Sequence, residues 1–363
     1  MYITEISGHH SATLAIEKGI KMLSGDAQVL NINAFHYTNP ISEKIVNRIY
    51  TTIIKKTPKI WDYVYDNPKI KNRIEKLQKS LHKLNSPKIK KLFDRFHPDI
   101  VVCTQAFPCG MVADYKKAYN SKLPLIAVLT DYVPHAYWIY DNVNYYIAPS
   151  EEVKQRLIKK GVPSYKIRAF GIPFDPAFNE PVDKNSIKER LNLDPALKTI
   201  LIMGGGQGLG PIKTIVKSLE KSNSAIQAII VAGTNKKLYK SLKKKIKGYK
   251  NKILLYGYVN NINELMSISD IVITKPGGIT TSEALAKRLP LIIVKPLPGQ
   301  EINNTVYLME QQAAIKIDKP ELTNEVIEDL LSNPQELKRL SESAGSIAKP
   351  NAAVGIARFI LEQ

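Results

Sequence analysis

The feature that most constrains this chain is a rhythm repeated along its length: a short apolar run, a loop rich in Gly, Pro, Ser or Asn, and then a helical stretch. The runs are β-branched and nearly continuous, which is typical of strands buried on both faces of a parallel sheet. Strands that alternate with helices predict an α/β fold with doubly wound sheets. The predicted strands are Tyr2–Ile6, Gln28–Ile32, Ile100–Cys103, Leu125–Leu129, Tyr145–Ala148, Ile167–Phe170, Thr199–Met203, Ala228–Val231, Ile253–Tyr256, Ile271–Thr274 and Leu291–Val294.

A proline-stiffened link divides the chain. Gly171–Pro176 forms the link, and Pro181–Pro195 stays polar before the next apolar run begins. At about 150 residues per domain, the length also predicts two domains. We therefore expect two Rossmann-like domains, at 1–174 and 196–345, facing each other across a cleft. Residues 350–363 are predicted to form a final helix that could pack back on the first domain.

Composition excludes several classes of protein. An apolar fraction of 44% excludes a disordered or fibrous chain. No apolar run reaches the roughly 18 residues of a membrane span. Cys103 and Cys109 are too few for a disulfide framework or a cysteine-rich zinc site. The segment Met1–Ile6 lacks the pattern of a secretory signal, so we expect a cytoplasmic protein.

The formal charge of +19 predicts an anionic partner: nucleic acid, lipid headgroups or a phosphorylated small molecule. Two runs concentrate this charge. Lys69–Lys91 has apolar residues at three- and four-residue spacing, which predicts a basic amphipathic helix that packs on its own domain or lies on an anionic bilayer. Lys236–Lys252 holds nine lysines and no acid, and we interpret it as a solvated helix face.

Ligands of open α/β sheets bind at the carboxyl ends of strands, so the loops there are candidate sites. Gly204–Gly210 follows one predicted strand and either cradles an anion or forms a tight turn that binds nothing. The turn that starts at Lys275 is followed by Thr280, Thr281 and Ser282, which can cap the next helix. Free N–H groups at this helix start would suit a diphosphate.

Four further features could serve catalysis or binding. Glu283, in the first helical turn, either accepts two ribose hydroxyls or complements the helix dipole. Pro296–Asn304 is either a sugar-binding loop or a polar surface loop. In the first half, the histidines of Ser7–Ala12 are either proton acceptors or surface residues. Thr130–Trp138 offers Asp131 and His135 as base or orienting groups, with helix capping by Asp131 and core roles for the aromatics as the alternatives.

Taken together, these segments resemble the lipid-glycosylating enzymes that comprise monogalactosyldiacylglycerol synthases and processive diacylglycerol glucosyltransferases. A more distant similarity is to the N-acetylglucosaminyltransferase that forms lipid II. The most specific motifs are Ile273–Thr280, Ser282–Ala284 and Pro298–Glu301 with Asn304. The supporting motifs are Gly8–Ala12, Asn39-Pro40, Tyr50, Pro58, Thr130-Asp131 with His135 and Trp138, and Gly171–Pro173.

The resemblance implies a GT-B fold and an inverting transfer of a hexose from a UDP-sugar to a lipid hydroxyl. The donor would be UDP-glucose or UDP-galactose, bound by the C-terminal domain. The acceptor would be diacylglycerol or a glycosyl-diacylglycerol, bound by the N-terminal domain. No metal and no cofactor beyond the UDP-sugar co-substrate are implied, because helix N-termini can stabilise the departing UDP.

The resemblance also implies a role for individual residues. His9 would be the general base, with Asp131 as the alternative, and His135 and Trp138 would lie on the acceptor side. In this family several glycines usually precede the histidine, whereas here only Gly8 does. The donor-binding residues would be Gly205, Gly206, Pro276, Gly277, Gly278, Ile279 and Thr280 at the diphosphate, Tyr258 and Val259 at the uracil, Glu283 at the ribose, and Gln300, Glu301 and Asn304 at the sugar.

A diacylglycerol stays in the bilayer, so the enzyme must reach an anionic membrane surface. We expect the first lysine run to dock there through Lys69, Lys71, Lys76 and Lys79, which makes the protein peripheral on the inner face of the cell membrane. Three alternatives remain: a GT-B enzyme for another lipid or a polyprenyl-linked acceptor, a nucleotide-sugar epimerase, and a nucleic-acid binder. We expect no nucleic acid, because the basic runs lack interleaved stacking aromatics.

Overall fold

The computed structural model describes residues 1–38, 85–134 and 138–363. The chain forms two compact units. The first comprises Met1–Pro176, Leu297–Gln300 and Asn351–Gln363, and the second comprises Ala177–Pro296 and Glu301–Pro350. The C-terminal residues therefore belong to the first unit.

The first unit is built on a parallel sheet with the strand order β1-β2-β3-β4. Successive side chains of β2 point to opposite faces. Ile126 and Val128 pack in one core with α1 and α16, whereas Leu125 and Ala127 pack in a second core with α6 and α7. The strands are β1 (Val101–Cys103), β2 (Leu125–Val128), β3 (Tyr145–Ile147) and β4 (Ile167–Arg168). The helices are α1 (Gly8–Leu23), α2 (Ala34–Thr38), α6 (Ala106–Ala118), α7 (Glu151–Lys159), α16 (Ala352–Leu361) and one whose described part spans 85–96.

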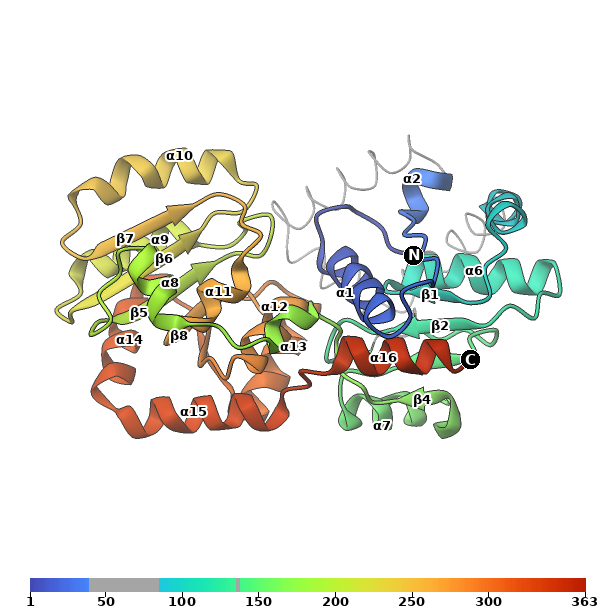
Figure 1. Cartoon of the computed structure of the whole chain (residues 1–363). Helices are drawn as coiled ribbons and strands as arrows, with labels where there is room; N and C mark the ends of the chain where they lie inside the picture. Colours follow the sequence, from blue (N-terminus) through green and yellow to red (C-terminus); the bar gives the residue numbers. More distant parts are fainter. Residues whose placement is uncertain (39–84, 135–137) are drawn as a thin grey trace. The chain divides into compact units, whose positions relative to one another are not determined.

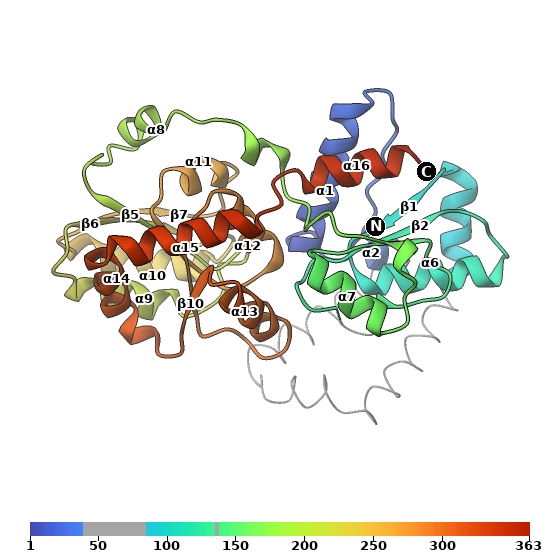
Figure 2. The ribbon, with the colours of Figure 1, turned by 90° about the horizontal axis from the view of Figure 1, so that it is seen from below.

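The final helix lies directly against the first one. Figures 1 and 2 show α16 beside α1, although the two helices are at opposite ends of the chain. A Cβ atom built on Gly19 of α1 would lie 2.8 Å from the carbonyl oxygen of Ala353. The absence of a side chain at Gly19 therefore permits the close approach of the two helices.

Two predicted strands of the first unit do not form. Tyr2–Ile6 and Gln28–Ile32 contribute only one parallel bridge, between Tyr2 and Asn33. In that bridge, the backbone N–H of Tyr2 donates to the carbonyl of Ile32 at 3.0 Å. The reason lies at Thr4, whose positive φ of 70° turns the chain away toward α1 before a second pair can form.

The second unit contains a parallel sheet with the strand order β10-β9-β8-β5-β6-β7. Its strands are β5 (Lys198–Met203), β6 (Ile226–Val231), β7 (Lys252–Tyr256), β8 (Ile271–Thr274), β9 (Leu291–Val294) and β10 (Ala314–Ile317). The strand β10 was not predicted from the sequence. It is an edge strand in which the exposed Lys316 interrupts the apolar run. The five other strands, and the α/β class, are confirmed.

The chain order reverses between β5 and β8, which are neighbours in the sheet. Such a reversal brings two strand-end loops together and is where ligands bind in this type of fold. The helices of the unit are α8 (Lys184–Arg190), α9 (Ile212–Ser218), α10 (Lys236–Lys245), α11 (Ile262–Ser267), α12 (Gly278–Ala286), α13 (Gln300–Glu310), α14 (Thr323–Ser332) and α15 (Pro334–Ile347). Short 3-10 turns lie at Ser164–Lys166, Pro176–Asn179, Leu219–Lys221, Ile246–Gly248 and Pro320–Leu322.

Some predictions concern residues outside the described ranges. They are the docking lysines Lys69, Lys71, Lys76 and Lys79, the acceptor-side His135, and the motif residues Asn39, Pro40, Tyr50 and Pro58. Within the described ranges, no helix combines the length and the apolarity needed to cross a bilayer.

Candidate active site

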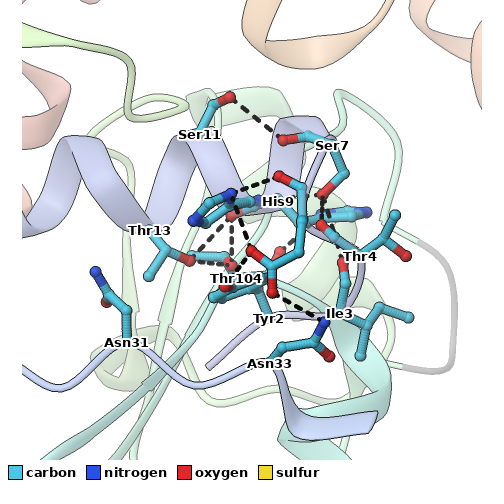
Figure 3. Close-up of polar contacts among 12 residues, drawn as sticks. Tyr2, Ile3, Thr4, Ser7, His9, Ser11, Thr13, Asn31, Asn33 and Thr104 are labelled. Carbon is cyan, nitrogen blue, oxygen red and sulfur yellow. Dashed lines mark hydrogen bonds and ion pairs between the residues drawn. The ribbon is translucent and has the colours of Figure 1, made fainter. Parts of the chain in front are cut away.

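The first part of the candidate site lies where α1 begins. Ser7 caps the helix, because its Oγ accepts a hydrogen bond from the backbone N–H of His10 at 3.3 Å. The same hydroxyl donates to the carbonyl of Thr4 at 2.7 Å. This cap places His9 in the first turn of α1, over the ends of β1 and β2, where Figure 3 shows it beside Thr104.

Two contacts of His9 define its protonation. The Nδ1 atom lies 2.9 Å from the carbonyl oxygen of Thr104 and 3.0 Å from the hydroxyl of Thr130. A carbonyl can only accept, so Nδ1 carries the proton in the neutral ring. The lone pair is then on Nε2, which is the tautomer that a general base requires.

The charge state of His9 is set mainly by burial. Burial lowers the pKa of His9 below its usual 6.5, while the negative charge of Asp131 and the bond to the Thr104 carbonyl raise it by less. The imidazole is therefore neutral at pH 7 and able to take a proton.

Two hydroxyl groups hold the backbone around His9. The hydroxyls of Thr13 and Thr104 are 2.9 Å apart, and each donates to the carbonyl of His9, at 3.0 and 2.9 Å. Figure 3 shows this cluster under the imidazole. Because Thr104 follows β1 and Thr130 follows β2, the sheet itself positions the base.

Asp131 lies next to Thr130 and acts on His9 through its charge. Its Oδ2 also accepts a hydrogen bond from Nε2 of Gln300 at 2.9 Å, within the first unit. The resemblance assigned Gln300 to the sugar, whereas in this structure its amide is bonded to Asp131. Trp138, expected on the acceptor side, is only 3% exposed and belongs to the core of the first unit. It therefore has the core role left open by the sequence.

In the second unit, the glycine loop after β5 is tightly closed. The N–H of Gly208 donates to the carbonyl of Gly205 at 3.0 Å, and Gly206 accepts from the N–H of Thr234 at 2.9 Å. A Cβ built on Gly205 would lie 3.3 Å from the Cε of Lys275. The loop after β5 thus meets the turn after β8, at the point where the chain order reverses.

The turn after β8 leads into α12 with an open helix start. The cap residue is Gly277, and no side chain caps the helix. The predicted cap by Thr280, Thr281 or Ser282 is therefore wrong: Thr281 instead donates to the carbonyls of Gly277 and Gly278, both at 3.0 Å. An uncapped helix start keeps its first N–H groups available to an anion such as a diphosphate.

Glu283 is half-buried in α12, on its second turn rather than its first. This correction follows from the helix starting at Gly278. The helix dipole acts mainly on the first turn, so the position of Glu283 argues against the alternative role of complementing it. A half-buried carboxylate one turn beyond the anion site remains suited to the ribose hydroxyls.

The loop after β9 and the start of α13 hold two further candidates. Glu301 forms an ion pair with Lys275, with the Nζ and Oε1 atoms 2.9 Å apart. Asn304 is 1% exposed, and its amide nitrogen donates to the carbonyl of Pro276 at 2.9 Å. Its amide N–H thus fixes the turn after β8, and sugar binding by Asn304 stays a prediction. Tyr258, which is 59% exposed, and Val259 follow β7 on the same sheet.

The comparisons with known proteins agree with this architecture. Residues 9–174 match the model of the monogalactosyldiacylglycerol (MGDG) synthase family, and residues 199–356 match that of the glycosyltransferase family 28 C-terminal domain. The processive diacylglycerol beta-glucosyltransferase of Bacillus licheniformis is 31% identical over 335 residues, covering 91% of this chain and 86% of that protein. The enzyme of the same name from Bacillus cytotoxicus is 32% identical over 365 residues, covering 98% and 91%.

The chain belongs to the family of monogalactosyldiacylglycerol synthases and processive diacylglycerol glucosyltransferases. The protein is thus a glycosyltransferase. Its fold is similar to that of MurG from Acinetobacter baumannii, with a TM-score of 0.58 at 16% identity over 77% of this chain and 78% of MurG. The GT-B fold is therefore confirmed.

Two site residues of this glycosyltransferase, Thr104 and Lys275, were not predicted from the sequence. Thr104 directly follows the strand Val101–Cys103, so the strand-end rule that selected the other loops also applies to it. Lys275 is part of the motif Ile273–Thr280, but its ion pair with Glu301 forms only because the turn after β8 lies beside the start of α13. Among the described residues, no three His, Cys, Asp or Glu side chains form a group that could hold a metal ion.

Proposed function

We propose that this enzyme transfers a hexose from a UDP-sugar to the hydroxyl of diacylglycerol or of a glycosyl-diacylglycerol, with inversion at the anomeric carbon. Glucose is the first sugar to test, because the relatives above are named as glucosyltransferases. The observation that carries the proposal is the geometry of His9, whose Nδ1 proton is committed to the Thr104 carbonyl.

In the proposed reaction, the acceptor oxygen attacks the anomeric carbon and forms the new glycosidic bond. The bond from that carbon to the UDP oxygen breaks, and the hydroxyl proton passes to Nε2 of His9. A single displacement inverts the configuration. The open start of α12 supports the step on the donor side, because its N–H groups and helix dipole favour the charge that develops on the diphosphate. We expect neither a metal nor a further cofactor.

The deciding experiment supplies purified protein with diacylglycerol vesicles and separately with UDP-glucose, UDP-galactose and UDP-N-acetylglucosamine. Mass spectrometry of the lipids would show a hexosyl-diacylglycerol, with and without a chelator. If a nucleotide sugar is instead interconverted with its epimer and no lipid is modified, the epimerase alternative holds.

Glu283→Gln is expected to weaken UDP binding. A carboxylate accepts hydrogen bonds from both ribose hydroxyls, whereas an amide has only one acceptor oxygen. Loss of a charged hydrogen bond costs about 1.5–3 kcal/mol, or roughly tenfold to a hundredfold in Kd. Calorimetric titration with UDP measures the effect, with the exposed Glu310→Gln as the control. A structure of the UDP complex with the ribose elsewhere would remove Glu283 from this role.

We also propose that the enzyme reaches its acceptor at the inner face of the cell membrane through the first lysine run. This proposal follows from the sequence pattern of Lys69–Lys91 and the net charge of +19. The variant carrying Lys69→Glu, Lys71→Glu, Lys76→Glu and Lys79→Glu is expected to sediment poorly with anionic vesicles. Equal sedimentation with neutral and anionic vesicles would refute the docking role.

A further inference from the structure

The most concentrated charge of the described structure lies on α10 and has no part in the site described above. Lys236, Lys237, Lys240, Lys243 and Lys244 are all exposed, and we call these five residues the lysine face. Figure 1 shows α10 on the outside of the second unit. None of the five forms an ion pair with a described residue, although other lysines of the same unit do.

Five of the six lysines of α10 lie together on one side of the helix, and the sixth, Lys245, is its last residue and lies on the side of Leu238. At about 100° per residue, the lysine face spans an arc of roughly 120°. Leu238 and Leu242, which are 6% and 0% exposed, lie on the opposite side of the helix and pack into the core of the second unit. The core therefore requires only one side of α10, and its packing does not explain the lysines.

Lys243, Lys244 and Lys245 stand in the last turn of α10, where the helix dipole favours bases, but the other lysines work against the helix. Lys236 and Lys237 occupy the first turn, where the helix dipole favours acids, and that turn contains none. Lys240 stands four residues from both Lys236 and Lys244, and like charges at this spacing destabilise a helix. A helix selected only for stability would carry acids among these positions, so the arrangement indicates a polyanionic partner.

We propose that the lysine face of α10 is an electrostatic docking surface for an anionic lipid bilayer. The choice of a bilayer rests on the proposed function, because a lipid acceptor brings the enzyme to a membrane. This surface belongs to the second unit and is separate from the run Lys69–Lys91.

The residue types favour a bilayer over the other polyanions. The lysines carry compact point charges suited to a diffuse layer of headgroups, and 236–252 contains no arginine for bidentate phosphate recognition. The aromatic residues nearby, Tyr239 and Tyr249, pack against the core, which leaves the lysine face without a stacking platform for bases. The face also lacks apolar residues, so α10 lies on the headgroups without entering the acyl layer.

The test compares two full-length variants with the wild type. The first carries Lys236→Gln, Lys240→Gln, Lys243→Gln and Lys244→Gln on the lysine face. The matched control carries Lys184→Gln, Lys319→Gln, Lys338→Gln and Lys349→Gln, which removes the same charge from exposed positions scattered over the second unit. Partition is measured with vesicles of phosphatidylcholine, with and without phosphatidylglycerol, at rising salt. Circular dichroism checks that both variants are folded.

A lysine near an anionic surface contributes about fivefold to partition. The α10 variant should therefore lose tenfold or more of its binding to anionic vesicles, whereas the control should change by less than about threefold. Salt should weaken the binding of the wild type to anionic vesicles and reduce the difference in binding between the wild type and the α10 variant. Equal losses in both variants, or none in the α10 variant, would overturn the proposal. So would binding of duplex DNA or RNA that depends on these four lysines while vesicle partition does not.

A second measurement separates this inference from the proposed function. Transfer to dioctanoylglycerol in solution needs no bilayer, so both variants should retain it, while the α10 variant loses rate on anionic vesicles. If the wild type modifies neither acceptor, the proposed function fails, and the partition measurements still decide the role of α10.

Discussion

Replacing His9 by alanine is expected to lower kcat/KM for glycosyl transfer by about 10³-fold, which is the typical contribution of a positioned general base. The variant should retain UDP affinity, because the residues proposed to bind UDP belong to the second unit. Initial rates with diacylglycerol vesicles and calorimetric titration with UDP measure the two quantities.

The neighbouring histidine provides a matched control for His9→Ala. The Nδ1 atom of His10 is 2.5 Å from the carbonyl oxygen of Glu5, and its ring stacks on Tyr2 with the ring centres 4.3 Å apart. These contacts tie the ring of His10 to the loop, so we expect His10→Ala to keep the rate within a few-fold. A His9→Ala enzyme with most of its activity would remove His9 from the mechanism.

The pH dependence of the wild type gives a further check on the same residue. Burial lowers the pKa of His9 below its usual 6.5, and only the unprotonated ring can act as a base. The value of kcat/KM should therefore rise with pH through the acidic range and be level from about pH 7. A rise centred above pH 7 would contradict this assignment.

Gly208→Ala is expected to destabilise the second unit and abolish donor binding. Gly208 has a φ of 58°, and a Cβ built there would lie 1.9 Å from the carbonyl oxygen of Ala232. Backbone strain and overpacking together should cost about 3 kcal/mol. For a unit of this size, that corresponds to a fall in Tm of roughly 6–12 °C, which calorimetry can measure.

Gly248→Ala is the matched control for this substitution. A Cβ built on Gly248 meets no atom within 4 Å. The free energy of unfolding should therefore change by less than about 0.5 kcal/mol. If both variants melted at the wild-type temperature and bound UDP, the closed loop after β5 would not have the structure described above.

The strand pattern was the most predictable part of the fold. A strand buried on both faces needs a continuous apolar run, as Leu291–Val294 shows, and the run marks where the following loop begins. A strand at the edge of a sheet does not need a continuous apolar run. For that reason β10 was missed, and Tyr2–Ile6 was wrongly predicted as a strand, since its one bridge ends at the turn made by Thr4.

For the site residues too, positions that depend on local pattern were predicted, whereas those that depend on tertiary contacts were not. The loops that hold Asp131 and the turn after β8 were identified from sequence as strand ends, whereas His9 lies at the start of α1 and the strand predicted before it does not form. Partners were not predictable, because hydrogen bonds between loops depend on which strands are neighbours. Asn304 illustrates this: its place in a polar loop was evident from the sequence, but the hydrogen bond from its amide to the carbonyl of Pro276 was not.

The sequence by itself determined the α/β class, the two-part organisation of the motifs and the family, because these depend on periodicity and residue order. Only the tertiary structure decided the protonated nitrogen of His9, the open start of α12 and the side of α10 that packs on the core. Each of these depends on which groups meet across distant segments, and on which side of a helix the core occupies. Local sequence patterns do not contain that information.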